Sequence, residues 1–144
     1  QVDKFLGDGI LATFGAVSPS ETFAADALRA SQALVAAVTE AQDRFKAAGW
    51  PSDLRVGTAV AAGPVTVGVI GSKNRLEFTV IGDAVNRAAK LEDANKAQQS
   101  SALTDCVSLD LARAQGYAGD AVDIRPSCNV GGVSGPVDLA VLAR

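Results

Sequence analysis

The sequence contains no histidine and only two cysteines, and these absences exclude several common kinds of site. Without histidine the chain cannot build the usual Cys/His zinc sites, a Ser-His-Asp triad or a histidine general base. The cysteines, Cys106 and Cys128, do not form a CxxC pair. Any catalysis must therefore use carboxylates, amines, amides and bound cations.

The chain also lacks a long apolar run and an excess of positive charge. No apolar stretch approaches the length needed to cross a bilayer, and the first residues, Gln1 to Lys4, do not resemble a signal peptide. We therefore expect a cytoplasmic protein with no membrane-spanning segment. The formal net charge is −3 and no stripe of Lys and Arg is present, so we predict no nucleic-acid partner.

The composition that is present describes one ordinary domain. The 144 residues are 48% apolar and 20% charged, which is enough apolar material for a core. We predict a single domain over residues 1–144 of the α+β class, with a mixed sheet and helices packed on one face. Because the chain begins directly at a strand, we expect an N-terminal strand of the fold to lie outside this sequence.

Short apolar runs and turn residues predict the strands. Lys4–Leu6 and Ile10–Phe14 flank the tripeptide Gly7-Asp8-Gly9, which indicates a β-hairpin with Asp8 at its tip. Two further runs joined by Ala62-Gly63-Pro64 predict a second hairpin. The two runs of that hairpin cover residues 54–61 and 65–70. Further strands are predicted over 76–81 and 136–142, with a short apolar piece at 102–103.

Capping residues and apolar spacing predict three helices. Ser18-Pro19-Ser20-Glu21 has the features of a helix start with Ser18 as N-cap, and Gly82-Asp83 predicts a helix through Asn95 with Asp83 as N-cap. A third helix is predicted over 105–114. The first helix ends before Gly49, and its apolar stripe is interpreted as core packing: Phe23, Ala27, Ala30, Leu34, Val38, Ala41 and Phe45. In the second helix the expected buried side is Val85, Ala88, Ala89 and Leu91.

Three polar residues are candidates for chemistry. Asp8 lies in a glycine-flanked turn, where carboxylate oxygens suit Mg²⁺ and its phosphates, although a turn aspartate without further function is the alternative. Asn86 and Lys90 are four residues apart and share one helix face. An amide and an amine there are able to hold a polar substrate, or they are simply two solvated surface residues.

Three ordered segments resemble the signature blocks of class III nucleotide cyclase catalytic domains, which convert ATP or GTP to a 3′,5′-cyclic nucleotide. The blocks run from Lys4 to Gly15, from Leu54 through Gly63-Pro64 to Gly71, and from Thr79 to Glu92. Their order and spacing also match, over roughly residues 1–97, and three ordered blocks are more specific than one short motif. The resemblance implies the ferredoxin-like, mainly antiparallel sheet of these cyclases.

The resemblance also implies a role for each matching residue. Asp8 corresponds to the second of two metal-binding aspartates, with two Mg²⁺ or Mn²⁺ ions as cofactors. Lys4 and Thr79 correspond to the residues that face the purine, and Asn86 to the asparagine that orients the nucleotide. Adenine offers an acceptor at N1 and a donor at N6, which suit a lysine and a hydroxyl, whereas relatives that prefer GTP usually have glutamate and cysteine there. We therefore expect ATP as substrate.

The chain departs from the family pattern at two positions. The transition-state arginine is replaced by Lys90, which keeps the charge but loses the planar fork of donors. A phosphate-binding lysine near the C-terminal strand is replaced by Gly131. Two functions therefore remain open: a cyclase that works as a head-to-tail homodimer with shared sites, under an N-terminal regulatory domain, or an inactive cyclase-like domain that binds nucleotide or a partner protein.

Overall fold

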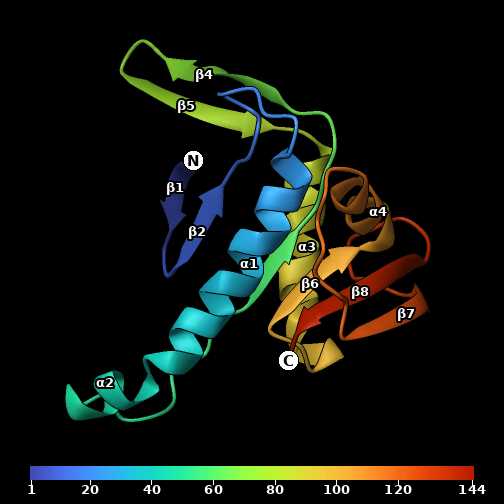
Figure 1. Ribbon diagram of the computed structural model, residues 1–144. Coiled ribbons are helices and arrows are strands. Elements are labelled where there is room, and N and C mark those ends of the chain that lie inside the picture. The colour runs from blue at the N-terminus through green and yellow to red at the C-terminus, as the bar shows by residue number, and fades with distance from the viewer.

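The computed structural model describes residues 1–144 except the side chain of Arg75. Figure 1 shows the helices and strands along the chain. In chain order they are β1 (Val2–Leu6), β2 (Gly9–Ala12), α1 (Phe23–Glu40), α2 (Gln42–Ala47), β3 (Thr58–Val60), β4 (Thr66–Ser72), β5 (Arg75–Ile81), α3 (Asp83–Gln98), β6 (Ala102–Asp105), α4 (Cys106–Ala114), β7 (Asp123–Cys128) and β8 (Val137–Ala143).

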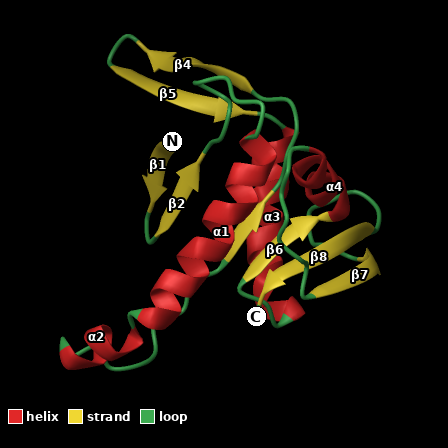
Figure 2. Ribbon diagram, in the orientation of Figure 1, coloured by secondary structure: helices red, strands yellow, loops and turns green.

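A four-stranded sheet with the order β3-β6-β8-β7 lies at the centre of the fold. β3 is parallel to β6, and β8 is antiparallel to both β6 and β7. β1–β2 and β4–β5 form two separate antiparallel pairs, which Figure 2 shows beside and above the helices. The predicted fold class, a mixed α+β fold with mainly antiparallel strands, is confirmed.

Helices cover both faces of the central sheet, whereas the sequence predicts one helical face. Successive residues of a strand point to opposite faces, and β8 follows this rule. Ala140 and Leu142 pack in a core with α1 and α4, whereas Leu139 packs in a second core with Leu91 of α3. Buried apolar side chains on both faces of one sheet therefore require a helix layer on each side.

The predicted first hairpin is confirmed, but the second is wrong. β1 and β2 pair antiparallel around Gly7-Asp8, and Gly7 has a φ of 67°, which favours glycine. β3 and β4 do not pair with each other: β3 pairs with β6, and β4 pairs with β5. The backbone N–H of Ala62 donates to Ser108 Oγ in α4 at 2.8 Å, so the segment after β3 is attached to α4 instead of closing a tight turn.

The first helix differs from its prediction in its start and in its buried face. α1 begins at Phe23 after Thr22, not at Ser18, and a separate short helix, α2, follows Ala41. Leu34 of the predicted stripe is 45% exposed, and Ala30 is exposed too. The residues that the helix buries are Ala24, Ala25, Ala27, Leu28, Ser31 and Val35.

The two later helices agree more closely with their predictions. α3 begins at Asp83 with Gly82 as N-cap, so Asp83 is the first helical residue and not the cap, and the helix continues to Gln98. Ala89 is exposed, in contrast to its predicted burial, whereas Leu91 is fully buried. α4 is capped by Asp105, whose Oδ1 accepts from the Ser108 backbone N–H at 2.7 Å. No helix in the described part of the chain is long and apolar enough to cross a membrane.

Candidate active site

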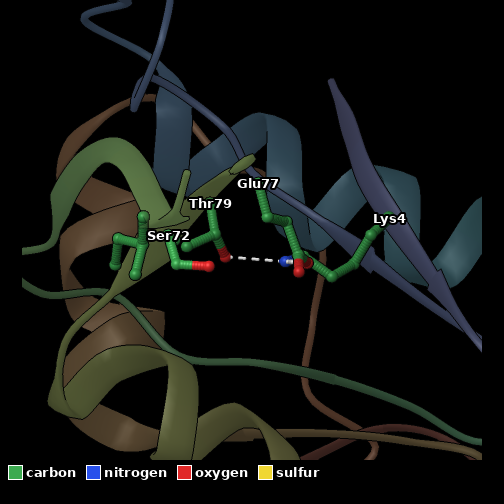
Figure 3. Close-up of a pocket in the computed structure, with 6 residues that line it drawn as sticks. Lys4, Ser72, Glu77 and Thr79 are labelled. Atoms are coloured by element: carbon green, nitrogen blue, oxygen red, sulfur yellow. Dashed lines mark hydrogen bonds and ion pairs between the residues drawn. The ribbon is translucent and has the colours of Figure 1, made fainter. Parts of the chain in front are cut away.

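The two residues predicted to face the purine meet each other across two strands that are distant in sequence. Lys4 Nζ in β1 donates a hydrogen bond to Thr79 Oγ1 in β5 at 2.8 Å. Figure 3 shows the Lys4 side chain extending toward Thr79 and Glu77. The structure therefore brings an ammonium and a hydroxyl together at one point.

Glu77 belongs to the same cluster, although sequence analysis did not select it. Its carboxylate accepts a hydrogen bond from the Lys4 ammonium. Glu77 and Thr79 lie two residues apart in β5 and therefore on one face of the strand. Once Thr79 is placed in the site, the alternation of side chains along the strand identifies Glu77 as a neighbour on the same face.

A cavity of about 420 Å³ lies against this cluster. It is lined by Lys4, Ile70, Gly71, Ser72, Glu77 and Thr79. Ile70 and Gly71 of β4 provide an apolar wall, and the polar groups converge from β1 and β5. Apolar walls with a few convergent polar groups are typical of ligand sites. The cavity has room for a group as large as a purine base.

The charges around Lys4 keep its ammonium protonated. The hydrogen bond with Glu77 raises the pKa of Lys4 above its usual value, and the charges of Glu77 and Asp3 act in the same direction against the opposing effect of burial. The Lys4 side chain is 22% exposed, and that of Glu77 is 51% exposed. Lys4 is therefore a hydrogen-bond donor at neutral pH, able to meet an acceptor atom of a ligand.

The predicted catalytic residues lie in the N-terminal half of α3 and are not among the residues that line the cavity at Lys4. Asn86 is exposed, and Lys90 Nζ lies 3.5 Å from Asp93 Oδ2 in the next turn. The stem of Lys90 runs across Gly132 in the loop between β7 and β8. Gly131, the predicted counterpart of the phosphate-binding lysine, has no side chain that could compensate for the loss of that cation.

Asp8 lies exposed at the β1–β2 turn, and Figure 1 shows this turn pointing away from the β4–β5 hairpin. Asp8 is not among the residues that line the cavity at Lys4 and Thr79. Among the described residues, no group of three or more His, Cys, Asp and Glu side chains could hold a metal ion. The donor chemistry of Asp8 alone fits a divalent cation, because Mg²⁺ prefers carboxylate oxygens.

A sequence profile of the adenylate and guanylate cyclase catalytic domain matches residues 3–124. The chain belongs to this family. The match spans the β1–β2 hairpin, the β4–β5 hairpin and α3, so the Lys4 cluster, Asp8 and the α3 residues are all parts of a cyclase domain. The predicted resemblance to class III cyclases is thereby confirmed.

The curated relatives of this cyclase domain are much longer proteins. An uncharacterized protein of Mycobacterium tuberculosis is 34% identical over 128 residues, which cover 86% of this chain and 22% of that protein. The terminal-differentiation-specific adenylate cyclase of Dictyostelium discoideum is 33% identical over 103 residues, which cover 71% of this chain and 5% of that protein. The domain thus spans 22% or less of the length of these two relatives.

Solved cyclase structures resemble the whole chain. The guanylyl cyclase Cya2 superposes with a TM-score of 0.80 and 26% identity, over 99% of this chain and 68% of that one. The adenylyl cyclase CyaB from P. aeruginosa gives a TM-score of 0.76 at 26% identity, over 99% of this chain and 71% of that one. Because one is named a guanylyl and the other an adenylyl cyclase, the likeness does not distinguish between the two purines.

Proposed function

We propose that this cyclase domain converts ATP to 3′,5′-cyclic AMP and pyrophosphate. The observation that carries the proposal is the convergence of Lys4 and Thr79, at 2.8 Å, on a cavity of about 420 Å³. Membership of the cyclase family supports the reaction class. The pair itself supports the choice of ATP, because a protonated amine matches the N1 acceptor of adenine and a hydroxyl oxygen matches its N6 donor.

Adenine binding redistributes the hydrogen bonds of Lys4. The ammonium has three N–H donors, and in this structure it donates to Thr79 and Glu77. When one of its N–H groups turns to adenine N1, Thr79 Oγ1 becomes free to accept from the N6 amino group. Guanine presents a donor at N1 and an acceptor at O6, so neither contact would match. The site therefore binds and orients one purine in preference to the other.

The residues of α3 act on the sugar and phosphates. In the proposed reaction the ribose 3′-oxygen attacks the α-phosphorus, the bond to the bridging oxygen of pyrophosphate breaks, and the hydroxyl proton passes to solvent. The exposed amide of Asn86 orients the nucleotide through hydrogen bonds. The Lys90 ammonium meets the negative charge that develops on the phosphate oxygens. These residues position reacting groups and stabilise charge, so the chemistry needs no histidine.

Asp8 would hold a divalent cation, Mg²⁺ or Mn²⁺, together with the phosphates and ligands from outside the described site. When bound, such ions lower the pKa of the ribose hydroxyl and neutralise phosphate charge. The contribution of Asp8 itself is a carboxylate on a short turn, where Gly7 and Gly9 allow the backbone to approach a ligand closely.

A head-to-tail homodimer supplies the arrangement that one chain lacks. Asp8 of one subunit would join Lys4, Thr79 and Asn86 of the other, since the β1–β2 turn points away from the β4–β5 hairpin in its own chain. Two cross-strand apolar pairs are exposed and support such an interface: Phe5 with Ile10 at 74% and 58%, and Val69 with Phe78 at 61% and 46%. We propose residues 1–144 as one catalytic domain that works in the cytoplasm under a regulatory domain.

An inactive, nucleotide-binding domain is the second candidate, and one observation favours it. Lys90, in place of the family arginine, pairs with Asp93 at 3.5 Å, so its charge is already partly engaged within α3. In that case Lys4 and Thr79 would still bind a purine nucleotide, and no cyclic product would form.

The two candidates are separated by measuring nucleotide binding and cyclic AMP formation in the same full-length protein. We expect cyclic AMP from ATP, and loss of ATP binding in Lys4→Ala. Lys46→Ala is the matched control, because Lys46 also pairs with a carboxylate, Asp53 at 2.9 Å, but lies on α2 outside the cavity. Tight ATP binding without turnover under any divalent cation would support the inactive domain instead.

A further inference from the structure

Asp3, the residue before Lys4, carries a buried carboxylate that the proposed reaction does not use. Its side chain is only 3% exposed, and Oδ2 is the one buried polar side-chain atom of the described residues without a hydrogen-bond partner. Lys4 Nζ lies 3.7 Å from this oxygen, too far for a hydrogen bond but close enough for a strong charge interaction.

A bulge in β1 explains why two adjacent side chains approach each other. Regular alternation would point Asp3 and Lys4 to opposite faces of the strand. The pairing of β1 with β2 shifts between Val2 and Lys4: Val2 lies opposite Ala12, and Lys4 lies opposite Leu11. Asp3 is therefore an extra residue without a partner, and such bulges redirect the side chains that they carry.

A buried carboxylate is costly unless a cation lies beside it. Lys4 is the cation that the structure pairs with Asp3, and the same ammonium bonds Thr79 and Glu77. If Lys4 were replaced by a carboxylate, the new charge would face Asp3 in a buried environment, where the repulsion is weakly screened. Glu77 would also repel the new charge, but its side chain is 51% exposed, so solvent screens its charge more than that of Asp3.

We propose that Asp3 is a specificity-determining residue that restricts position 4 to a cation and thereby restricts the base to adenine. A guanine-binding site needs an acceptor for the N1–H group, and the acceptor usual at position 4 in the family is a carboxylate. Asp3 opposes that replacement. The choice of purine therefore depends on three positions, 3, 4 and 79. This inference rests on the proposed function.

A double-mutant cycle on thermal stability tests the coupling without any turnover. We expect Lys4→Glu to lower the melting temperature of the full-length protein by about 5 °C or more, and Asp3→Asn to remove most of that loss. In the control cycle, Glu77→Gln should restore less of the melting temperature that Lys4→Glu loses. Equal losses with and without Asp3→Asn would overturn the proposal. If Lys4→Glu does not fold, the same cycle is run with Lys4→Gln. This change leaves the Asp3 carboxylate without its cation and should lower the melting temperature for that reason.

The second measurement addresses the choice of base. Lys4→Glu with Thr79→Cys should bind fluorescent GTP and ATP analogues with a changed affinity ratio, and adding Asp3→Asn should raise the GTP to ATP ratio by a further factor of about ten. Asp3→Asn alone should raise KM for ATP with little change in kcat. No change of the ratio on adding Asp3→Asn would overturn the proposal. Absence of cyclic AMP in the wild type would instead contradict only the proposed function, because the stability cycle and the affinity ratio do not need turnover.

Discussion

The side chain of Lys90 lies directly on Gly132, in a space that only a glycine leaves open. A β-carbon at position 132 would lie 2.9 Å from Lys90 Cε and 3.0 Å from Cδ, closer than carbon atoms approach without displacement. Gly132 also has a φ of 81°, a left-handed conformation that favours glycine. The Lys90 stem therefore lies against the loop between β7 and β8, and a side chain at position 132 would displace it.

Gly132→Ala should lower kcat for cyclic AMP formation by about tenfold or more, because a displaced Lys90 no longer meets the phosphate charge. KM for ATP should change little, since Lys4 and Thr79 hold the base. The effect should vanish in a Lys90→Ala background, where no side chain remains to be displaced. Steady-state kinetics of the four proteins provide the measurement.

Two other glycines of the same loop separate this displacement from backbone strain. Gly135 has a φ of 76°, but a β-carbon there would meet no atom within 4 Å, and Gly131 has neither the positive φ nor a close neighbour. Gly135→Ala and Gly132→Ala should each cost about 1 kcal/mol of stability, because both glycines have a positive φ. Only Gly135→Ala should keep the wild-type kcat. If Gly135→Ala lowers kcat as much as Gly132→Ala does, the contact with Lys90 is not the cause.

Lys90→Ala should lower kcat by about a hundredfold and leave KM for ATP nearly unchanged, because the charge it meets grows in the transition state. Lys90→Arg should stay within about tenfold of the wild type, since it keeps the positive charge and the stem that packs on Gly132. Equal rates for the wild type and Lys90→Ala would place this residue outside the reaction.

Asp105→Ala should destabilise the fold by about 2 kcal/mol, because one carboxylate caps α4 and also bonds Arg87 of α3. Asp105 is 3% exposed, and its Oδ2 lies 3.3 Å from an Arg87 nitrogen. Asp110→Ala is the matched control: Asp110 pairs with Arg113 at 3.9 Å on the solvent side of the same helix. Chemical denaturation should give the two losses, and similar values for both would contradict the capping role.

The first hairpin and the presence of α1, α3 and α4 could be predicted from the sequence, because turns and apolar spacing are local signals, whereas the start of α1 and the separate helix α2 could not. The pairing of β3 could not. Its partner β6 begins at Ala102, and between them lie two strands and α3, so proximity in sequence wrongly favoured β4. The buried face of α1 was predicted only in part: Ala27 is buried as expected, but alanines such as Ala24 and Ala25 fill the core without a strong apolar signal.

The candidate site, too, could be predicted from the sequence only in part. Lys4 and Thr79 were selected through family resemblance, and the structure brings them to 2.8 Å from each other. Glu77 could have been inferred from strand alternation. Asp3 could not, because alternation places it on the face opposite Lys4, and only the bulge in β1 reverses this.

Asp8→Ala should abolish cyclic AMP formation without lowering the melting temperature by more than about 2 °C, because an exposed turn side chain contributes little to the core. Asn86→Ala should also abolish turnover. The two inactive proteins should regain activity when mixed, since a head-to-tail heterodimer combines both substitutions in one site and leaves the other intact. At equal concentrations we expect about a quarter of the wild-type rate: random pairing makes half of the dimers mixed, and each has one working site of two. If the mixture stays inactive although size measurements show subunit exchange, Asp8 and Asn86 act in the same subunit and the shared site is wrong.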